Sequence, residues 1–577
     1  MNPTTRTNVV SGPRLAPRPA HENVAAHLPR TALARPDRAA VIEPNGRRGW
    51  RVVSYAELDQ RVDAIAHGLS GRGVARGDRV ALFVRPGSGL IAITFALFKL
   101  GAVPVLLDPG MGRKNVVACL ARVRPRVFVG VPLAHVVRAL HARALPSIEI
   151  AVVVGRAPWP GLESLAELAR PSAGPFACAE TRGDDTAAIL FTSGSTGPPK
   201  GVEYAHGMFG AQIEALRATY GFRPGERDLA CFPLFALFDA ALQTTCVIPR
   251  IDASRPGRCA PEDVADAILS HGCTYGFGSP AIWRRVVPWA IENGVRFPTL
   301  ERVMIAGAPV PPWLIDALRT RLDRGDVHTP YGATECLPVS TISGSELQDG
   351  LRARVEGGHG SCVGRPVPGI EIAILPVTED AVTNFDDAQA LGAGIVGEIV
   401  VSGDVVTRAY ADDARATARA KIRDGDRVWH RTGDAGYFDE DGRLWTVGRT
   451  AHRIETPTGV RWPVPLENVC DLHPRAARTA LVSWDANGCA EPCLVVEPRE
   501  GEWPRDPVER AVFADEMRAL ARAKLASGAP FDVPLPRRFA FHRAFPTDAR
   551  HNAKIRREDL ARFVASSSTV PHDGSES

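Results

Sequence analysis

Residues 191–201 read "FTSGSTGPPKG" (Phe191 to Gly201), and this stretch decides how the rest of the sequence is interpreted. The apolar run Ala187 to Leu190 precedes it and predicts a buried strand. Glycines let backbone N–H groups turn toward an anion, hydroxyl side chains add neutral donors, and Lys200 supplies a positive charge. A strand that leads into such a loop is typical of a phosphate-binding site. A Gly/Ser-rich surface linker is the alternative.

The loop differs from the Walker A phosphate loop, GxxxxGK[ST]. Pro199 precedes Lys200 where that motif has a glycine, and Gly201 follows where it has a magnesium-binding hydroxyl. We therefore expect a phosphate site of another design.

Outward from the loop, short apolar runs alternate with helical stretches. Ser54 and Glu57 form a capping-box pattern that predicts the start of a helix over residues 54–69. The apolar runs lie at residues 77–84, 102–107, 126–131, 148–155 and 187–192. This alternation favours α/β layers with largely parallel sheets.

Beyond Val400 the sequence changes to short strands and turns, with a hairpin turn predicted at Asp441-Gly442. A smaller unit follows, with a strand pair over 479–498 and a helix over 508–523. We therefore predict an α/β protein: a large N-terminal domain of layered sheets with a β-rich subdomain, and a small mobile α+β C-terminal domain. The expected boundaries are a flexible Pro-rich leader (1–20), the two domains (21–448 and 449–563) and a disordered tail (564–577).

Composition excludes several classes of protein. The 577 residues are 45% hydrophobic and 23% charged with a net charge of +4, which favours a soluble multidomain protein that binds no nucleic acid. The eleven cysteines are dispersed without CxxC pairs, so we expect reduced thiols and a cytoplasmic location. The most apolar stretch, 90–107, contains Lys99, Gly101 and Pro104, so no transmembrane segment is expected.

Lysine is rare in this chain, and arginine supplies most of the positive charge. The six lysines are Lys99, Lys114, Lys200, Lys421, Lys524 and Lys554. A GC-rich genome is the simple explanation, but a lysine in such a chain is also a candidate for a specific role.

Further motifs, in a fixed order, make the chain resemble the adenylate-forming superfamily of acyl-CoA synthetases, luciferases and peptide-synthetase adenylation domains. After the loop Thr192 to Gly201 come YGATE (331–335), GSCVGRPVPGIEI (360–372), GEIVVSG (397–403), RTGD (431–434), GR (448–449) and the lysine of HNAKIRR (551–557). The resemblance covers most of residues 35–560. It implies the superfamily's fold, ATP and Mg²⁺ as cofactors, and attack of a substrate carboxylate on the α-phosphate of ATP to give an acyl-adenylate and pyrophosphate.

The resemblance also implies roles for individual residues. Lys554 would bridge the α-phosphate and the substrate carboxylate, and Glu335, with Thr196, would bind Mg²⁺. Tyr331 would stack on adenine, while Asp434, supported by Arg449, would accept hydrogen bonds from the ribose hydroxyls. The full nucleotide-binding set is Thr192, Ser193, Gly194, Ser195, Thr196, Gly197, Lys200, Gly307, Ala308, Pro309, Tyr331, Gly332, Thr334, Asp434 and Arg449. Thr192 is also counted with Lys554 and Glu335 as catalytic. Taken singly, each has a structural alternative, such as a core tyrosine or a turn-forming aspartate.

Departures from the superfamily pattern narrow the choice of reaction. "PLFA" (233–236) replaces the usual "PLFH", so a histidine near the reacting carboxylate is missing. At the hinge, Ala451 stands where aspartate or lysine is usual and Glu455 where lysine is usual. The segment 456–463 also differs from the loop that meets a thiol donor, and "NAK" replaces the usual "GK" before Lys554. These changes weaken the case for thioester formation more than the case for adenylation.

The longer segments 231–242, 328–340 and 545–557 look most similar to the β-lactone synthetases of bacterial long-chain olefin biosynthesis, the OleC family. That likeness implies ATP-dependent conversion of a long-chain 2-alkyl-3-hydroxy fatty acid to a β-lactone, AMP and pyrophosphate. It also implies other olefin-biosynthesis enzymes as partners in an assembly. The alternatives are a long-chain acyl-CoA or acyl-AMP ligase and a degenerate nucleotide-binding scaffold.

Two features of ring closure to the β-lactone are open. His206 is the first candidate for a general base, and a packing role is its equal alternative. Phe232, Phe235, Phe238 and the segment 275–283 are candidate walls of an apolar substrate pocket, and a place in the core is the alternative for each.

Overall fold

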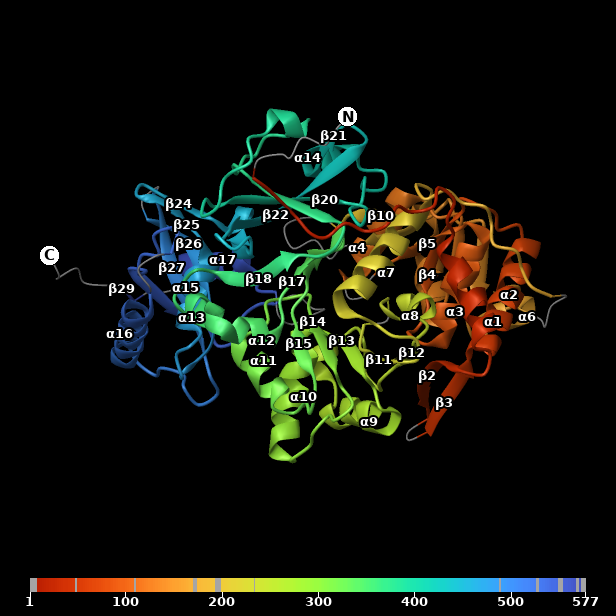
Figure 1. Ribbon diagram of the computed structural model, residues 1–577, viewed down its shortest axis with the longest axis horizontal. Helices are drawn as coiled ribbons and strands as arrows, with labels where there is room; N and C mark the ends of the chain where they lie inside the picture. The colour runs from red at the N-terminus through yellow and green to blue at the C-terminus, as the bar shows by residue number, and fades with distance from the viewer. Residues whose placement is uncertain are drawn as a thin grey trace.

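The computed structural model has α/β layers in the N-terminal part of the chain and a separate small unit in the C-terminal part (Figure 1). It describes residues 8–46, 49–107, 111–169, 174–191, 199–232, 234–486, 489–525, 529–547, 554–566 and 570–571.

The first sheet has seven strands and carries the candidate phosphate loop at one edge. Its order is β10-β9-β5-β4-β6-β7-β8. The strands are β4 (Arg79–Phe83), β5 (Val103–Leu106), β6 (Val127–Gly130), β7 (Ile150–Val153), β8 (Glu163–Ser164), β9 (Thr186–Phe191) and β10 (Gly201–Ala205). All neighbours pair parallel except β9 and β10, which are antiparallel. The predicted strands and their parallel pairing are therefore confirmed.

The second sheet also has seven strands, in the order β15-β14-β13-β11-β12-β2-β3. They are β2 (Ala39–Asn45), β3 (Gly49–Ser54), β11 (Arg227–Ala230), β12 (Thr245–Val247), β13 (Tyr275–Gly278), β14 (Arg302–Ile305) and β15 (Asp326–His328). Only β3 pairs antiparallel.

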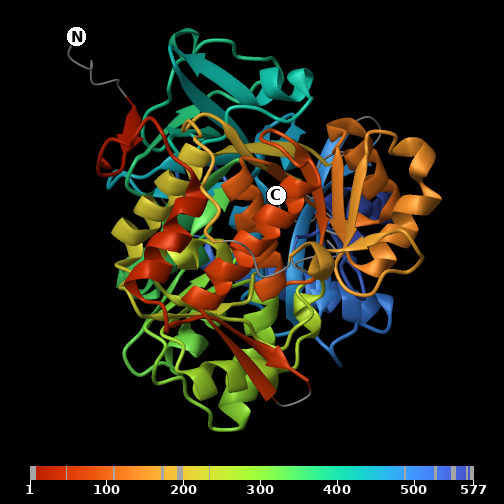
Figure 2. The ribbon, with the colours of Figure 1, turned by 90° about the vertical axis from the view of Figure 1, so that its right-hand side faces the viewer.

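Helices fill the space between the two sheets and cover their outer faces, so that helix and sheet layers alternate (Figure 2). The central helices are α1 (His27–Ala34), α2 (Tyr55–Gly71), α3 (Ser88–Leu100), α7 (His206–Tyr220) and α8 (Ala236–Leu242). The outer helices are α4 (Arg113–Val123) and α5 (Pro132–Leu140) on the first sheet, and α9 (Pro261–His271), α10 (Pro280–Glu292) and α11 (Pro312–Arg319) on the second. The short helix α6 (Leu165–Leu168) packs beside α2. The predicted capping box is present, because the Ser54 side chain accepts from the Glu57 N–H and the Glu57 side chain accepts from the Ser54 N–H.

A third, antiparallel sheet forms the β-rich part that the sequence predicts. Its order is β1-β19-β20-β22-β23-β18-β17-β16, with β21 on β22. The strands are β1 (Val9–Ser11), β16 (Tyr331–Ala333), β17 (Cys336–Thr341), β18 (Ser361–Pro366), β19 (Ile370–Leu375), β20 (Gly397–Gly403), β21 (Lys421–Asp424), β22 (Arg427–Phe438) and β23 (Leu444–Arg449). The predicted hairpin turn at Asp441-Gly442 joins β22 to β23. Three short helices accompany the sheet: α12 (Gly344–Glu346), α13 (Arg352–Glu356) and α14 (Ala414–Ala420).

The C-terminal unit has its own core, which includes Leu466, Phe513 and Phe539. It contains a small hairpin, β24 (Ile454–Thr456) and β25 (Gly459–Arg461), and a sheet of β26 (Ala476–Ala486), β27 (Cys489–Pro498), β28 (Arg538–Phe541) and β29 (Val570–Pro571). Its helices are α15 (Pro463–Cys470), α16 (Pro507–Lys524) and α17 (Arg557–Ser566). The predicted strand pair and the helix over 508–523 correspond to β26, β27 and α16.

The chain ends differ from the expected leader and tail. Val9–Ser11 pairs with β19, so this part of the predicted flexible leader is a strand. The predicted tail begins inside α17, and Val570–Pro571 pairs with β28. A strand of three residues beside several prolines carries almost no periodic signal, which is why the sequence does not reveal it.

Within the described residues, no helix combines the length and apolarity needed to cross a bilayer. Ten of the eleven cysteines lie among the side chains that the structure describes, and these ten are free thiols, as expected.

Candidate active site

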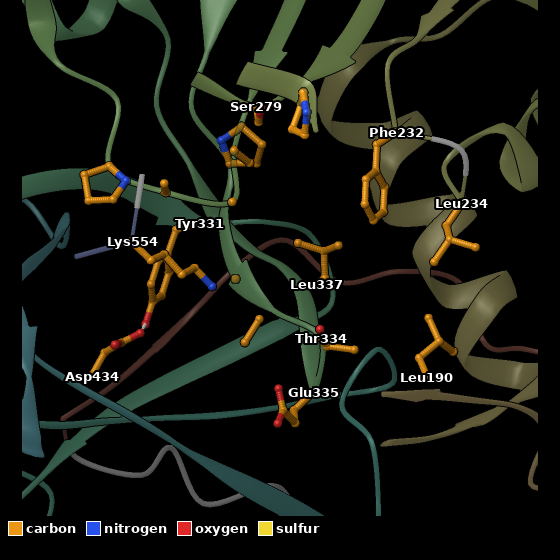
Figure 3. A pocket seen from close by; sticks show the side chains of 18 of the residues that line it. Leu190, Phe232, Leu234, Ser279, Tyr331, Thr334, Glu335, Leu337, Asp434 and Lys554 are labelled. Atoms are coloured by element: carbon orange, nitrogen blue, oxygen red, sulfur yellow. Dashed lines mark hydrogen bonds between the residues drawn. The ribbon is translucent and has the colours of Figure 1, made fainter. Parts of the chain in front are cut away.

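A cavity of about 1470 Å³ opens where the two α/β sheets, the third sheet and the C-terminal unit meet. Its wall includes Leu190 of β9, Phe277 of β13, Asp434 of β22 and Lys554 ahead of α17. Charged and polar side chains lie at one end and apolar side chains at the other (Figure 3). Segments that are hundreds of residues apart in the sequence therefore share one site.

Asp434 is the centre of a polar group at one end of the cavity. Its Oδ2 accepts a hydrogen bond of 2.7 Å from the Tyr331 hydroxyl, and its Oδ1 accepts one of 2.9 Å from Arg449 Nη1. Asp434 and Arg449 face each other across β22 and β23, so the hairpin fixes this pair. Burial and the Asp434 charge raise the pKa of Tyr331, and the Asp434 charge raises the pKa of Arg449. The group therefore offers a carboxylate as a hydrogen-bond acceptor.

Glycine, alanine, proline and threonine residues form another part of the cavity wall. Gly307, Ala308 and Pro309 follow the end of β14 and line the cavity, as do Gly332 and Thr334. A Cβ added at Gly332 would lie 2.7 Å from the carbonyl oxygen of Cys336, so no larger residue fits there without a shift of the backbone. Gly332 therefore keeps this part of the wall free of a side chain.

Glu335 lies at the next corner of the cavity, close to two lysines. Its Oε1 accepts a hydrogen bond of 2.8 Å from the Tyr410 hydroxyl. Lys200 Nζ lies 5.0 Å from the centre of the Tyr410 ring, and Lys421 Nζ lies 5.9 Å from it. Burial lowers the pKa of Lys421 to about 8, although Cys336 and Glu335 act in the opposite direction. This corner combines a carboxylate with positive charge.

Sequence reasoning missed Tyr410 and Lys421, but the rarity of lysine was a signal for the latter. Lys200, Lys421 and Lys554 all lie in or beside this site. Lys99 is buried with Asp59 and Asp63 and has a structural role. Lys114 and Lys524 are exposed.

Lys554 enters the cavity from the C-terminal unit, on the side of Tyr331 and Asp434 (Figure 3). Three residues later, Arg557 is buried against Glu467 of α15, with contacts of 2.5 Å to Oε1 and 2.8 Å to Oε2. Arg557 Nη1 also donates to the carbonyl oxygen of Leu481, at 3.1 Å. This anchor holds the segment that carries Lys554 at the mouth of the cavity.

The candidate phosphate loop itself lies outside the described residues, which resume at Pro199. This applies to Thr192, Ser193, Gly194, Ser195, Thr196 and Gly197. The two flanking strands are paired, with Gly201 opposite Phe191, and Lys200 lines the cavity.

The structure does not bring His206 to the cavity. It is 1% exposed at the start of α7, and its Nδ1 accepts a hydrogen bond of 3.3 Å from the Val24 N–H. Burial lowers its pKa to about 4. The geometry favours the packing role over that of a general base.

The apolar end of the cavity is built from aromatic and aliphatic side chains. Phe235 stacks on Phe277 with 3.9 Å between ring centres, and Phe232 and Phe238 lie next to them. Leu190, Leu234 and Leu337 complete this part of the wall (Figure 3). Of the expected segment 275–283, Phe277, Ser279 and Ile282 line this cavity, whereas Tyr275 and Trp283 belong to the core.

The arrangement suits a molecule with an anionic, hydrogen-bonding part and a hydrocarbon part. A carboxyl group bound where the polar end of the cavity meets the apolar end would have Lys554 on one side and an alkyl pocket on the other.

Comparison with known proteins shows the family and the fold of the chain. The family model described as AMP-binding enzyme matches residues 28–411 of the chain. The olefin beta-lactone synthetase of Xanthomonas campestris pv. campestris is 44% identical over 556 residues, which cover 94% of this chain and 97% of that protein. The olefin beta-lactone synthetase of Stenotrophomonas maltophilia is 44% identical over 555 residues, which cover 93% and 97%. The crystal structure of the anthranilate CoA ligase AuaEII in complex with anthranoyl-AMP superposes with a TM-score of 0.78 at 20% identity, over 95% of this chain and 98% of that one. The fold expected from the sequence is thereby confirmed.

Proposed function

Because the chain belongs to the AMP-binding enzyme family, we propose that it uses ATP to adenylate a long-chain 2-alkyl-3-hydroxy fatty acid and then closes it to a β-lactone. AMP and pyrophosphate are the other products. The observation that carries this proposal is the two-ended cavity, in which Lys554, Glu335 and Asp434 face a hydrocarbon pocket.

The polar end has the groups that a nucleotide needs. Asp434 would accept hydrogen bonds from the ribose, and the Gly307–Pro309 wall would meet the adenine opposite Tyr331. Lys200 would bind the phosphates together with the loop 192–198. Lys554 would neutralise charge on the α-phosphate while the substrate carboxylate attacks, which is electrostatic and positional catalysis.

Glu335 fits a Mg²⁺ ion that is shared with phosphates. Within the described residues no cluster of three His, Cys, Asp or Glu side chains could hold a metal by itself. Mg²⁺ is commonly held by one or two carboxylates together with substrate phosphates and water, so a single carboxylate is enough. The ion would supply charge neutralisation for the phosphates when bound.

The second step would take place inside the molecule of activated acid. The 3-hydroxyl oxygen would form a bond to the acyl carbon, the bond from that carbon to the AMP oxygen would break, and the hydroxyl proton would pass to the departing phosphate group of AMP. The apolar walls would limit the access of bulk water to the mixed anhydride.

Three observations favour lactone formation over transfer to CoA. Both relatives at 44% identity are named olefin beta-lactone synthetases. Ala236, in the place of the usual histidine, is 4% exposed and packed in α8. At the hinge, Glu455 is exposed and pairs with Arg453.

The decisive experiment supplies the enzyme with ATP, Mg²⁺ and a 2-alkyl-3-hydroxy fatty acid without CoA. We expect pyrophosphate release and a β-lactone detectable by NMR. Product that appears only after CoA is added would identify an acyl-CoA ligase instead. Release of pyrophosphate with acyl-AMP as the final product would identify an acyl-AMP ligase. The enzyme's cytoplasmic location and its assembly with other olefin-biosynthesis enzymes stay predictions.

A further inference from the structure

Gln212 lies in the wall of the cavity with one end of its amide fixed. It belongs to α7 and is 2% exposed. Its Nε2 donates a hydrogen bond of 2.9 Å to the carbonyl oxygen of Leu337, which belongs to β17. Because the nitrogen is held in this way, the position of the amide oxygen is also set.

That amide oxygen, Oε1, is buried and accepts no hydrogen bond in the described part of the protein. A buried acceptor without a donor is unfavourable, and such groups in native proteins call for an explanation. Gln212 lines the large cavity, so a bound molecule can supply the missing donor.

The neighbouring hydroxyl cannot supply it. The Tyr204 hydroxyl also lies at the cavity wall, but it donates to the carbonyl oxygen of Thr334 at 2.5 Å. Its only proton is therefore already used.

The position of Gln212 separates it from the nucleotide end. Leu337, its partner, lies between Thr334 and the pair Phe232 and Leu234, whereas Asp434 lies on the opposite side of the cavity (Figure 3). Through its hydrogen bond to Leu337, the Gln212 amide is tied to the part of the wall between Thr334 and the apolar side chains, where a carboxylate would end and its hydrocarbon would begin.

At this junction the groups of the proposed substrate differ in what they can donate. A carboxylate, an acyl-adenylate carbonyl and an alkyl chain carry no N–H or O–H. The 3-hydroxyl of a 3-hydroxy acid carries one, two carbons away from the reacting carbon.

We propose that the Gln212 amide oxygen binds the 3-hydroxyl of the substrate and so selects 3-hydroxy acids over plain fatty acids. This inference rests on the proposed function. A hydrogen bond from the hydroxyl to Oε1 leaves the oxygen lone pairs free and turns them toward the acyl carbon. Gln212 is then a positioning and specificity residue, because an amide is too weak a base to take the proton.

The first test uses the wild-type enzyme and three acids with the same alkyl chains. They carry a hydroxyl, a fluorine or a hydrogen at carbon 3, and the readout is kcat/KM for pyrophosphate release. Fluorine is close to a hydroxyl in size but donates no hydrogen bond. We expect the fluoro and hydrogen acids to be poorer by about tenfold to a hundredfold, because each leaves Oε1 without a donor. A fluoro acid as good as the hydroxy acid would overturn the proposal.

The second test replaces Gln212 by methionine, which has a similar length and no amide. In Gln212→Met we expect the preference for the hydroxy acid over the hydrogen acid to fall to about twofold or less. A role limited to holding Leu337 would lower kcat/KM for both acids equally and leave their ratio unchanged, which would contradict the proposal. Tyr204→Phe is the matched control, because it removes a neighbouring hydroxyl and should leave the ratio as in the wild type.

The two proposals can fail separately. If the wild type makes β-lactone but the ratio does not respond to Gln212→Met, only the role of Gln212 is lost. If no β-lactone forms from any acid, the proposed function is lost, while the ratio for pyrophosphate release still reports on hydroxyl recognition.

Discussion

A single carboxylate can organise much of a nucleotide site when two donors hold it in place. Asp434 receives the Tyr331 hydroxyl on one oxygen and the Arg449 guanidinium on the other. The ion pair with Arg449 compensates the charge of the carboxylate, and the cross-strand register keeps it at the cavity wall. The side chain is therefore held in place at the cavity wall, as the proposed contact with ribose requires.

We expect Asp434→Asn to raise the KM for ATP about tenfold or more, with a smaller change in kcat. The amide keeps the shape but loses the charge that strengthens hydrogen bonds to ribose hydroxyls. Pyrophosphate release at varied ATP concentration measures this. Tyr331→Phe is the control, since it removes only one donor to Asp434 and should raise the KM for ATP less. An equal effect of both substitutions would argue against a direct role of the Asp434 charge.

Two acidic residues, Asp228 and Asp239, are buried in the region of the second sheet. Asp239 accepts hydrogen bonds from Thr244 and Tyr275, of 2.8 and 2.9 Å. Burial raises the pKa of Asp239 to about 6 and, together with the charge of Asp239, raises the pKa of Asp228. The folded state therefore favours the protonated acids.

This pair predicts a dependence of stability on pH. Both folded-state pKa values lie above those of the unfolded chain, so the stabilising effect is present at low pH and is lost as the pH rises, for Asp239 through about 6. We expect Asp228→Asn to gain about 1–3 kcal/mol relative to wild type between pH 5 and pH 8. Denaturant unfolding at the two pH values measures it.

The control for this prediction is Asp323→Asn, which changes a half-exposed carboxylate paired with Arg296. Its effect should be within about 0.5 kcal/mol at both pH values. A loss of stability in Asp228→Asn that is the same at pH 5 and pH 8 would contradict the titration argument.

At the scale of elements, the start of α2 has the two capping hydrogen bonds that its sequence pattern predicts. Glu57 N–H donates to Ser54 Oγ at 3.1 Å, and the Ser54 N–H donates to Glu57 Oε2 at 2.7 Å. The helix then packs along α3 in the central layer.

We expect Ser54→Ala to lower the free energy of unfolding by about 1 kcal/mol, because the first turn loses its capping acceptor. Ser70→Ala, at an exposed position near the other end of α2, should change it by less than about 0.5 kcal/mol. Denaturant unfolding followed by circular dichroism compares the two. Similar values for both would show that the cap has no special role.

Helix α17 matters for a different reason, because its first residue fixes the approach of Lys554. Arg557 is buried between Glu467 and the Leu481 carbonyl. We expect Arg557→Ala to destabilise the C-terminal unit by about 3–5 kcal/mol, since Glu467 would keep a buried charge without its cation. Pyrophosphate release should fall together with stability, and unfolding and activity assays measure both.

The neighbouring residue gives the matched control. Arg556 pairs with Asp559 near the surface and is 60% exposed, so Arg556→Ala should cost at most about 1 kcal/mol. If Arg556→Ala and Arg557→Ala lowered pyrophosphate release equally, the buried anchor would not be what positions Lys554.

At the scale of the whole molecule, local patterns predicted the elements well and contacts between distant segments poorly. The parallel strands of the first sheet, α16 and the hairpin at Asp441-Gly442 follow from periodicity and turn residues, which act over a few positions. The order of motifs led to the residues around Asp434 and Glu335, which the structure gathers in one cavity.

The features that the sequence did not reveal depend on tertiary contacts. The Gln212–Leu337 hydrogen bond joins residues 125 positions apart, and no local pattern marks it. Tyr410 and Lys421 become part of the site only because β21 and the segment before α14 fold back on Glu335. His206 follows directly after β10, yet the start of α7 turns it into the core.

The three residues of β1 have a practical consequence for anyone who shortens this chain. Strand β19 is flanked by β20 on one side and by β1 on the other. An enzyme trimmed at about residue 14 would lose that cover and leave a row of N–H and C=O groups open along β19. We expect two trimmed copies to pair at this border, because uncovered sheet edges are prone to pair with one another.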